Sequence, residues 1–248
     1  MNTQEARELG EILAVLVNSG QPEQASDLLF PVLAERTPFR LLDIIGLRLG
    51  TESLEPVNSF LDLVAVQRTM GGWIIIASAL RQQFKRDHPG AFERARIYAI
   101  IADTWYAADS IGERLPGPAL VTSFEPALLG LASWRGDTNR WVRRLVGVAV
   151  HYWAKQAKGK PRLHPQAEAL LELLSPLFSE VDLDAAKGVG WGLKTLGRYY
   201  PDLVADWLSR QVGMPHRSLV RPHRALMLRK ATLYMPAELR KIVLEKFQ

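Results

Sequence analysis

The sequence of 248 residues contains no cysteine. The absence of thiols excludes disulfide frameworks, thiolate zinc sites, iron–sulfur clusters and cysteine nucleophiles. It also favours a reducing compartment, and we expect a cytoplasmic protein. Because 48% of the residues are hydrophobic, the chain can still bury a large core without such cross-links.

Long apolar runs and metal-ligand motifs are lacking as well. The longest apolar run, WIIIASAL from Trp73, is far shorter than the roughly 20 residues of a membrane-spanning helix. The N-terminal stretch MNTQEARELGEIL is polar and acidic, whereas a signal peptide is basic and then apolar. The five histidines show no metal-ligand spacing, and neither a phosphate-binding P-loop nor a G-x-S-x-G motif occurs. We therefore expect no membrane segment, no metal and no cofactor.

Strand signals are scarce, because no alternating Val/Ile/Thr run is bounded by Asn-Gly or Asp-Gly. Nearly every segment instead places apolar residues at i, i+3, i+4 and i+7, which predicts helices. Segments with Pro, Gly or Asn divide this pattern near residues 20, 37, 88, 116, 137, 161 and 200. None is a long linker, so we predict an all-α protein with a single domain over residues 1–248.

The formal charge of +5 is distributed unevenly. Residues 1–134 carry 11 Lys+Arg against 16 Asp+Glu, whereas residues 135–248 carry 20 against 10, so the two parts have charges of −5 and +10. A basic part of this kind attracts polyanions such as nucleic acid, although a solvated basic surface without a partner gives the same pattern. Charge alone leaves both interpretations open.

A weak internal repeat is present in the basic part. An offset of 47 residues aligns two stripes that each run i, i+4, i+7, i+11 along a helix. The aligned sets are Arg140, Arg144, Gly147 and His151 with Lys187, Trp191, Lys194 and Arg198, followed by Tyr152-Trp153 with Tyr199-Tyr200. A period in the forties with helical units is typical of HEAT-like repeats, which stack into a solenoid with a concave binding surface.

The first stripe lies beside a separate apolar stripe on the same predicted helix, formed by Trp141, Leu145, Val148 and Tyr152. We therefore expect the polar stripe to face away from the core. The alternative is that Arg143 and Arg144 are ordinary surface charges that cover apolar neighbours.

A third stripe occurs in the stretch IADTWYAADSIG, where Trp105, Asp109 and Gly112 run i, i+4, i+7. We read this stretch as part of one helix whose core face is formed by Ile97, Ile101, Ala108 and Ile111. If the three stripes line one concave wall, two indoles, one carboxylate and two cations converge. The alternatives to a functional role are that Trp105 packs in the core and that Asp109 is solvated or forms a salt bridge.

Two further segments are unusual. KGVGWGLK has glycine at 188, 190 and 192 inside a helical pattern, which indicates close approach either of a neighbouring helix or of a sugar-phosphate chain. RSLVRPHRALMLRK places Arg217, Arg221 and Arg224 at i, i+4 and i+7. We expect these arginines only to add to the positive electrostatic potential of the basic part, without a specific contact.

Three motifs taken in order carry a family resemblance. They are W-x-x-x-D-S from Trp105 to Ser110, NRWVRRLVGVAV from Asn139, and KGVGWGLKTLGRYYPDLVADWL from Lys187 to Leu208. Together they resemble the AlkD family of DNA alkylation repair enzymes, which are HEAT-like-repeat DNA glycosylases. The similarity covers about residues 70–240.

The resemblance implies an enzyme that removes N3- and N7-alkylated purines from duplex DNA without flipping the lesion into a deep pocket. The DNA-contacting positions of the family fall on Trp105, Asp109, Arg144 and Trp191. Lys194 stands where the family usually has Arg, which keeps the charge but loses the bidentate fork. We predict that Asp109, Trp105 and Trp191 are catalytic and that DNA is bound by Arg140, Arg143, Arg144, Lys187, Lys194 and Arg198.

The residue types suit this chemistry independently. Cleavage of an N-glycosidic bond builds positive charge on the sugar, which a nearby carboxylate stabilises. A cationic alkylated purine leaves as a neutral base, so one carboxylate is enough. We expect a monomer acting on alkylated double-stranded DNA. Two alternatives remain: a non-catalytic DNA-binding helical module, and a scaffold that binds an acidic protein partner.

Overall fold

The computed structural model describes residues 1–212 and 222–247, and in this part of the chain the regular structure is entirely helical. The predicted all-α fold class is therefore confirmed. The chain divides into two compact units, residues 1–115 and 116–248. Each unit is a stack of helix pairs, as in a helical solenoid. None of the described helices combines the length and apolar character that crossing a membrane requires.

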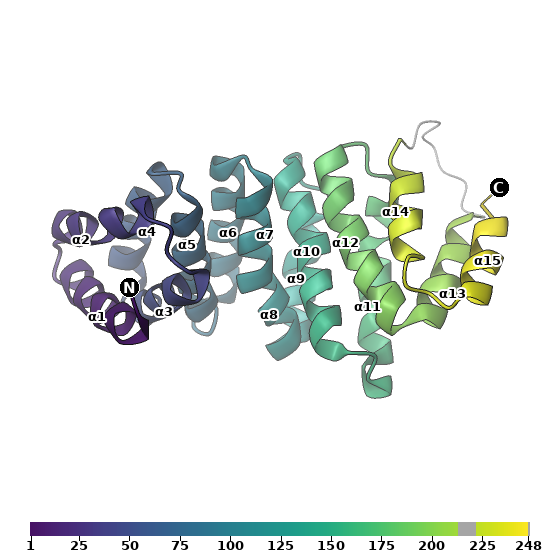
Figure 1. Ribbon diagram of the computed structural model, residues 1–248, viewed down its shortest axis with the longest axis horizontal. Coiled ribbons are helices and arrows are strands. Elements are labelled where there is room, and N and C mark those ends of the chain that lie inside the picture. The colour runs from purple at the N-terminus through teal and green to yellow at the C-terminus, as the bar shows by residue number, and fades with distance from the viewer. Residues whose placement is uncertain (213–221, 248) are drawn as a thin grey trace. The chain divides into compact units, whose positions relative to one another are not determined.

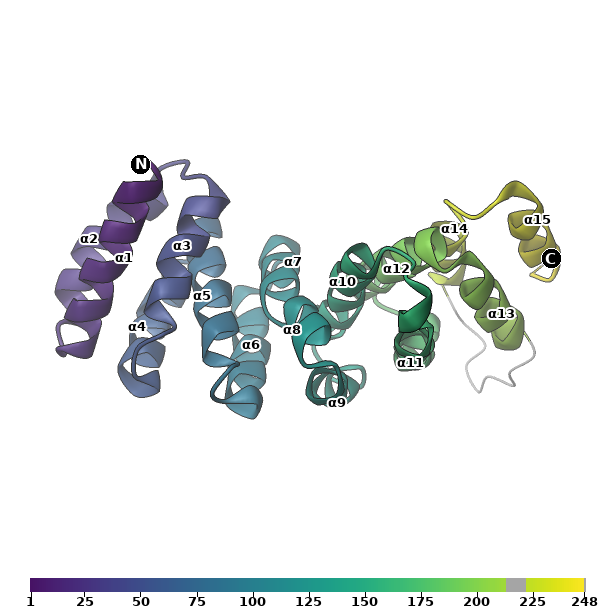
Figure 2. The ribbon, with the colours of Figure 1, turned by 90° about the horizontal axis from the view of Figure 1, so that it is seen from below.

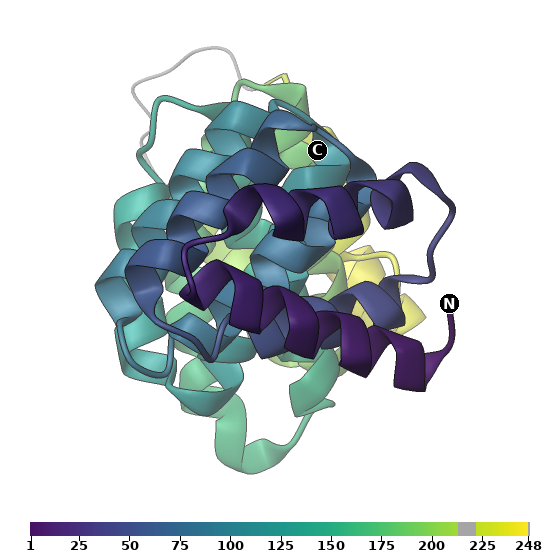
Figure 3. The ribbon, with the colours of Figure 1, turned by 90° about the vertical axis from the view of Figure 1, so that its left-hand side faces the viewer.

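The first unit consists of antiparallel helix pairs in two layers (Figures 1 and 2). One layer contains α1, α3, α5 and α7, and the other contains α2, α4 and α6. Figure 3 shows the first pair, α1 and α2, in purple. The helices are α1 (Thr3–Asn18), α2 (Pro22–Ala34), α3 (Phe39–Leu49), α4 (Leu54–Val66), α5 (Met70–Gln83), α6 (His88–Ala102) and α7 (Trp105–Arg114).

The core of the first unit is centred on α5. The run from Trp73 to Leu80 is buried on every side, because α5 packs against helices of both layers. Gly46 of α3 lies directly against this helix, and a Cβ at that position would overlap the Ile75 carbonyl oxygen. The close crossing of α3 and α5 thus requires glycine.

The second unit repeats the same arrangement, with α8, α10, α12 and α14 in one layer and α9, α11, α13 and α15 in the other (Figures 1 and 2). Its α-helices are α8 (Pro116–Thr122), α9 (Phe124–Trp134), α10 (Arg140–Ala157), α11 (His164–Leu174), α12 (Leu183–Tyr199), α13 (Pro201–Val212), α14 (Arg224–Ala231) and α15 (Ala237–Glu245). Two short 3₁₀ helices, η1 (Pro161–Leu163) and η2 (Pro176–Ser179), precede α11 and follow it.

The predicted repeat corresponds to α10 and α12, which are neighbours in one layer, but its register was wrong. Both helices begin after a capping side chain, Asn139 for α10 and Asp182 for α12. They begin at Arg140 and Leu183, so equivalent positions lie about one helical turn closer than 47 residues. A stripe with i, i+4 spacing matches itself almost as well after a one-turn shift, which explains the error.

The expectation that the polar stripe of α10 faces away from the core was also wrong. Arg144, Gly147 and His151 are buried, because this stripe packs against α12. A Cβ at Gly147 would overlap the backbone of Gly188, and one at Gly192 would lie 2.7 Å from the Gly147 carbonyl oxygen. The glycines of α12 therefore serve helix packing, as the first of the two interpretations held.

The stretch IADTWYAADSIG is not one continuous helix. Helix α6 ends at Ala102, Asp103 adopts the left-handed conformation with φ 45°, and extended Thr104 precedes α7. Ile97 and Ile101 belong to α6 and are exposed, which corrects their assignment to a core face. Trp105 is the first residue of α7.

Candidate nucleic-acid interface

Helix α7 carries the predicted Trp–Asp pair on its surface. Trp105 is 57% exposed and makes an edge contact with the ring of Tyr106, with centroids 6.0 Å apart. Core packing is thereby excluded for Trp105. Asp109 lies one turn further along the same face and is partly exposed. On the other side, Ala108 and Ile111 are fully buried and hold the helix in place.

Arg114, the last residue of α7, forms an ion pair within the first unit. Its Nε and Nη2 donate to the two carboxylate oxygens of Asp43 at 2.6 and 3.3 Å. Ser78 of α5 donates to the same carboxylate at 2.7 Å. This network ties the C-terminal end of α7 to α3 and α5, and so sets the orientation of the helix that bears Trp105 and Asp109.

In the second unit, α10, α12 and the turn after α14 surround a pocket of about 190 Å³. Three of the predicted residues, Trp191, Lys194 and Arg198, line it. Sequence reasoning did not identify the contributions of Lys155 and Tyr234. Lys155 follows His151 by one helical turn, so its place on the same stripe could have been recognised from the sequence. Tyr234 comes from the next repeat, and nothing in the sequence around it indicates that it lines this pocket.

One wall of this pocket is a stack of His151 on Trp191. Their ring centroids are 3.9 Å apart and the planes differ by 21°. His151 Nδ1 lies 2.7 Å from Thr195 Oγ1, and the Thr195 hydroxyl donates to the Trp191 carbonyl at 3.1 Å. Burial, with smaller contributions from Lys155 and Lys194, lowers the pKa of His151 to about 4. The imidazole is therefore neutral at pH 7, and it braces the indole from the neighbouring helix.

Positive charge is concentrated around this pocket. The Lys194 ammonium lies 5.2 Å from the centroid of the Tyr234 ring, and the Arg198 guanidinium lies 5.3 Å from it. Burial lowers the pKa of Lys230 on α14, and the nearby Lys194, Arg144, Arg229 and Lys187 lower it further. Such mutual repulsion between cations favours binding of an anion.

The other predicted cations of α10 and α12 have different surroundings. Arg144 is 7% exposed and donates to the Asp184 carbonyl at 2.8 Å. Arg143 forms a bidentate ion pair with buried Glu180 at 2.7 and 3.0 Å and also donates to the carbonyls of Asp137 and Thr138. This geometry gives no support to a phosphate contact by Arg143.

The remaining predicted cations lie on the surface. Arg140 is exposed at the start of α10, with its guanidinium 4.8 Å from the centroid of the Trp141 ring. Lys187 is exposed and paired with Asp184 at 3.2 Å. Arg217 and Arg221 lie outside the described residues. The structure thus brings Trp105 and Asp109 together in one unit and Trp191, Lys194 and Arg198 together in the other. That these two groups meet at one nucleoside stays a prediction.

Within residues 1–212 and 222–247, no three His, Asp or Glu side chains are arranged to hold a metal ion. In a comparison with known families, the model of a family described as "DNA alkylation repair enzyme" matches residues 73–235. No curated protein and no solved structure matches the chain significantly.

Proposed function

Because the chain belongs to the DNA alkylation repair enzyme family, we propose that it is a DNA glycosylase for N3- and N7-alkylated purines in duplex DNA. The family indicates a role in alkylation repair and DNA as the partner. The glycosylase reaction and its substrate are the proposal. It acts as a monomer and needs only water as co-reactant.

The reaction requires little general acid catalysis. Alkylation at N3 or N7 makes the purine cationic, so the base departs neutral and takes the electrons of the glycosidic bond with it. Positive charge then develops on the deoxyribose, in an oxocarbenium-like transition state. A single carboxylate can stabilise this charge and position the attacking water.

The observation that carries the proposal is the pair on α7. Trp105 is 57% exposed, and Asp109, one turn later on the same face of the helix, is partly exposed. An indole face attracts a cationic sugar with an energy on the order of 0.5–2 kcal/mol. Asp109 is the carboxylate of this pair.

In this proposal the residues that bind the DNA backbone belong to the second unit. Lys194 and Arg198 contact phosphates beside the indole of Trp191, which is held by neutral His151. The cluster that depresses the pKa of Lys230 is the electrostatic source of the affinity. We retain Arg140, Arg144 and Lys187 as further predicted DNA contacts and Trp191 as a predicted catalytic residue.

Base release from methylated duplex DNA tests the proposal. We expect Asp109→Asn to abolish release of 3-methyladenine and 7-methylguanine while leaving duplex affinity nearly unchanged. Asp103→Asn is the matched control, because Asp103 is exposed two residues before α7 and Asn tolerates its left-handed conformation. Equal base release by wild type and Asp109→Asn would remove Asp109 from the catalytic role, and absence of release by wild type would leave only a DNA-binding module.

A further inference from the structure

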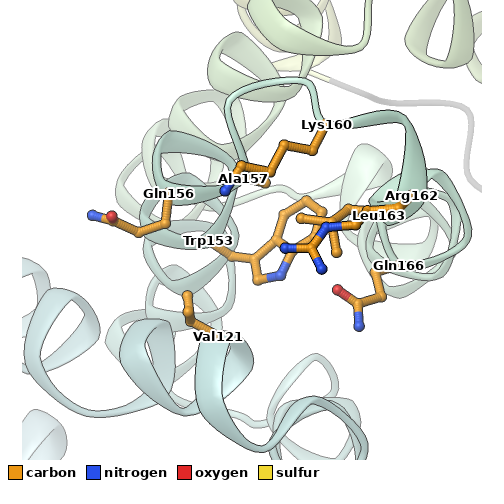
Figure 4. Close-up of a pocket in the computed structure, with 8 residues that line it drawn as sticks. All are labelled: Val121, Trp153, Gln156, Ala157, Lys160, Arg162, Leu163 and Gln166. Atoms are coloured by element: carbon orange, nitrogen blue, oxygen red, sulfur yellow. The ribbon is translucent and has the colours of Figure 1, made fainter.

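A second pocket of the basic unit lies outside the surface described above. It has a volume of about 290 Å³ and lies between α8, the C-terminal end of α10 and the turn that leads into α11 (Figure 4). Trp153 and Gln156 reach it from α10, whereas Lys160, Arg162 and Gln166 reach it from the turn and α11. Trp153 follows His151 by two residues, so the two pockets lie on opposite sides of α10.

The pocket gathers positive charge without compensation. Lys160 and Arg162 both extend from the turn toward α10 in Figure 4, and no carboxylate belongs to the described lining. Within residues 1–212 and 222–247, neither side chain makes an ion pair or hydrogen bond. Arginines elsewhere in this unit do: Arg143 is held by Glu180 and Arg210 by Glu172. Two unpaired cations at one pocket favour an anionic ligand.

The backbone that carries these cations is fixed in place. Lys158 and Gly159 adopt left-handed conformations with φ 50° and 72°. A Cβ at Gly159 would lie 2.7 Å from the Tyr199 carbonyl oxygen, and the Tyr200 hydroxyl donates to the Lys160 carbonyl at 3.4 Å. The turn is therefore packed against the end of α12. A preformed turn reduces the entropy that a ligand must overcome on binding.

The remaining lining residues suit an organic group that is covalently attached to the anion. Val121 and Leu163 are apolar, and beneath them lies the buried ring of Trp153, which is 2% exposed and stacks on Tyr200 with centroids 6.1 Å apart. The amides of Gln156 and Gln166 can both donate and accept hydrogen bonds. A volume of 290 Å³ is at the lower limit of small-molecule pockets, which suits a ligand of the size of one nucleotide.

We propose that this pocket binds one nucleoside phosphate, with the phosphate held by Lys160 and Arg162 and the base or sugar against Val121 and Leu163. The nucleotide is either free or an unpaired nucleotide of a DNA strand. The inference rests on this pocket alone and is independent of the glycosylase activity proposed above.

Calorimetric titration of the full chain with deoxyadenosine monophosphate tests the proposal, with deoxyadenosine, inorganic phosphate and oligothymidylate as further probes. We expect saturable binding of the monophosphate that is tighter than that of the nucleoside or of phosphate. The double variant Lys160→Gln/Arg162→Gln weakens it roughly tenfold or more, because charge-assisted hydrogen bonds are lost. Arg135→Gln/Lys241→Gln removes the same charge from exposed positions outside the pocket and leaves affinity within about twofold.

A steric variant keeps the charge intact. Val121 is 49% exposed, so Val121→Trp fills the pocket without disturbing the core and weakens binding as strongly as loss of the cations. If the pocket variants weaken oligothymidylate binding more than the charge-matched control does, the ligand is a nucleotide of a strand; if only the monophosphate responds, it is a free nucleotide. Absence of saturable binding by both probes, or an equal effect of the control variant, overturns the proposal.

Discussion

The imidazole of His151 on α10 is stacked on the indole of Trp191 on α12, with ring centroids 3.9 Å apart. Thr195 completes the arrangement, since its hydroxyl group lies within hydrogen-bonding distance of His151 Nδ1 and of the Trp191 carbonyl. A histidine that was visible in the sequence only as part of a stripe thus fixes a ring predicted to contact DNA.

The first prediction concerns pH. The pKa of His151 is lowered from 6.5 to about 4, so between these values the unfolded chain binds a proton that the folded chain does not. Stability contributed by neutral His151 is therefore present above pH 6.5 and is lost as the pH falls toward 4, by an amount on the order of 3 kcal/mol. Urea unfolding at a series of pH values, for wild type and His151→Gln, measures this difference. If the free energy of unfolding depends on pH in the same way for both proteins, titration of His151 does not contribute to stability.

The second prediction concerns Lys194, which stands where the resemblance leads us to expect Arg. We expect Lys194→Arg to strengthen duplex binding, because a guanidinium can hold a phosphate through two hydrogen bonds. Lys194→Ala should weaken binding to all duplex sequences alike and reduce the slope of log affinity against log salt by about 1. Fluorescence anisotropy at several salt concentrations measures both effects. A loss confined to particular sequences would contradict a phosphate contact.

The third prediction concerns the crossing of α10 and α12. We expect Gly147→Ala to destabilise the protein by about 2 kcal/mol or more, because the added methyl group overlaps the Gly188 backbone and the helices must separate. Gly136→Ala is the control, since a Cβ there meets no atom within 4 Å. Thermal unfolding monitored by circular dichroism compares the two variants. Equal stability of both would mean that the contact adapts without cost.

The fourth prediction separates Arg143 from the DNA-binding residues. We expect Arg143→Gln to cost about 3 kcal/mol of stability, because it leaves the Glu180 carboxylate buried without its partner. Its effect on DNA affinity should be no larger than that of Arg135→Gln, an exposed position between α9 and α10 that has no predicted DNA contact. Urea unfolding and anisotropy measure the two quantities. A large loss of affinity in a protein of unchanged stability would instead restore a phosphate role.

Much of the helix boundary pattern could be predicted from single residues with a strong conformational bias. Pro22, Pro161 and Pro201 each lie at a helix start that the breaker segments indicated. The break between α6 and α7 was missed because Asp103 and Thr104 are neither Gly nor Pro, and Asp103 enters the left-handed region without a glycine to signal it.

The candidate site could be predicted less completely, because local spacing says which residues share a face but not what that face contacts. Trp105 is exposed in the structure, whereas the similar stripe through Arg144 and Gly147 is buried against α12. Arg143 and Arg144 are adjacent in the sequence, yet only tertiary contacts reveal that Glu180 holds the first.

Periodicity and composition were sufficient to establish an all-helical chain with an acidic and a basic part, since both depend on the order of residues along the chain. Tertiary structure alone decided which stripes became helix contacts and which remained at the surface. The reason is geometric: a neighbouring helix approaches most closely where small side chains such as Gly147 and Gly188 coincide, and that coincidence arises only when separate repeats pack together.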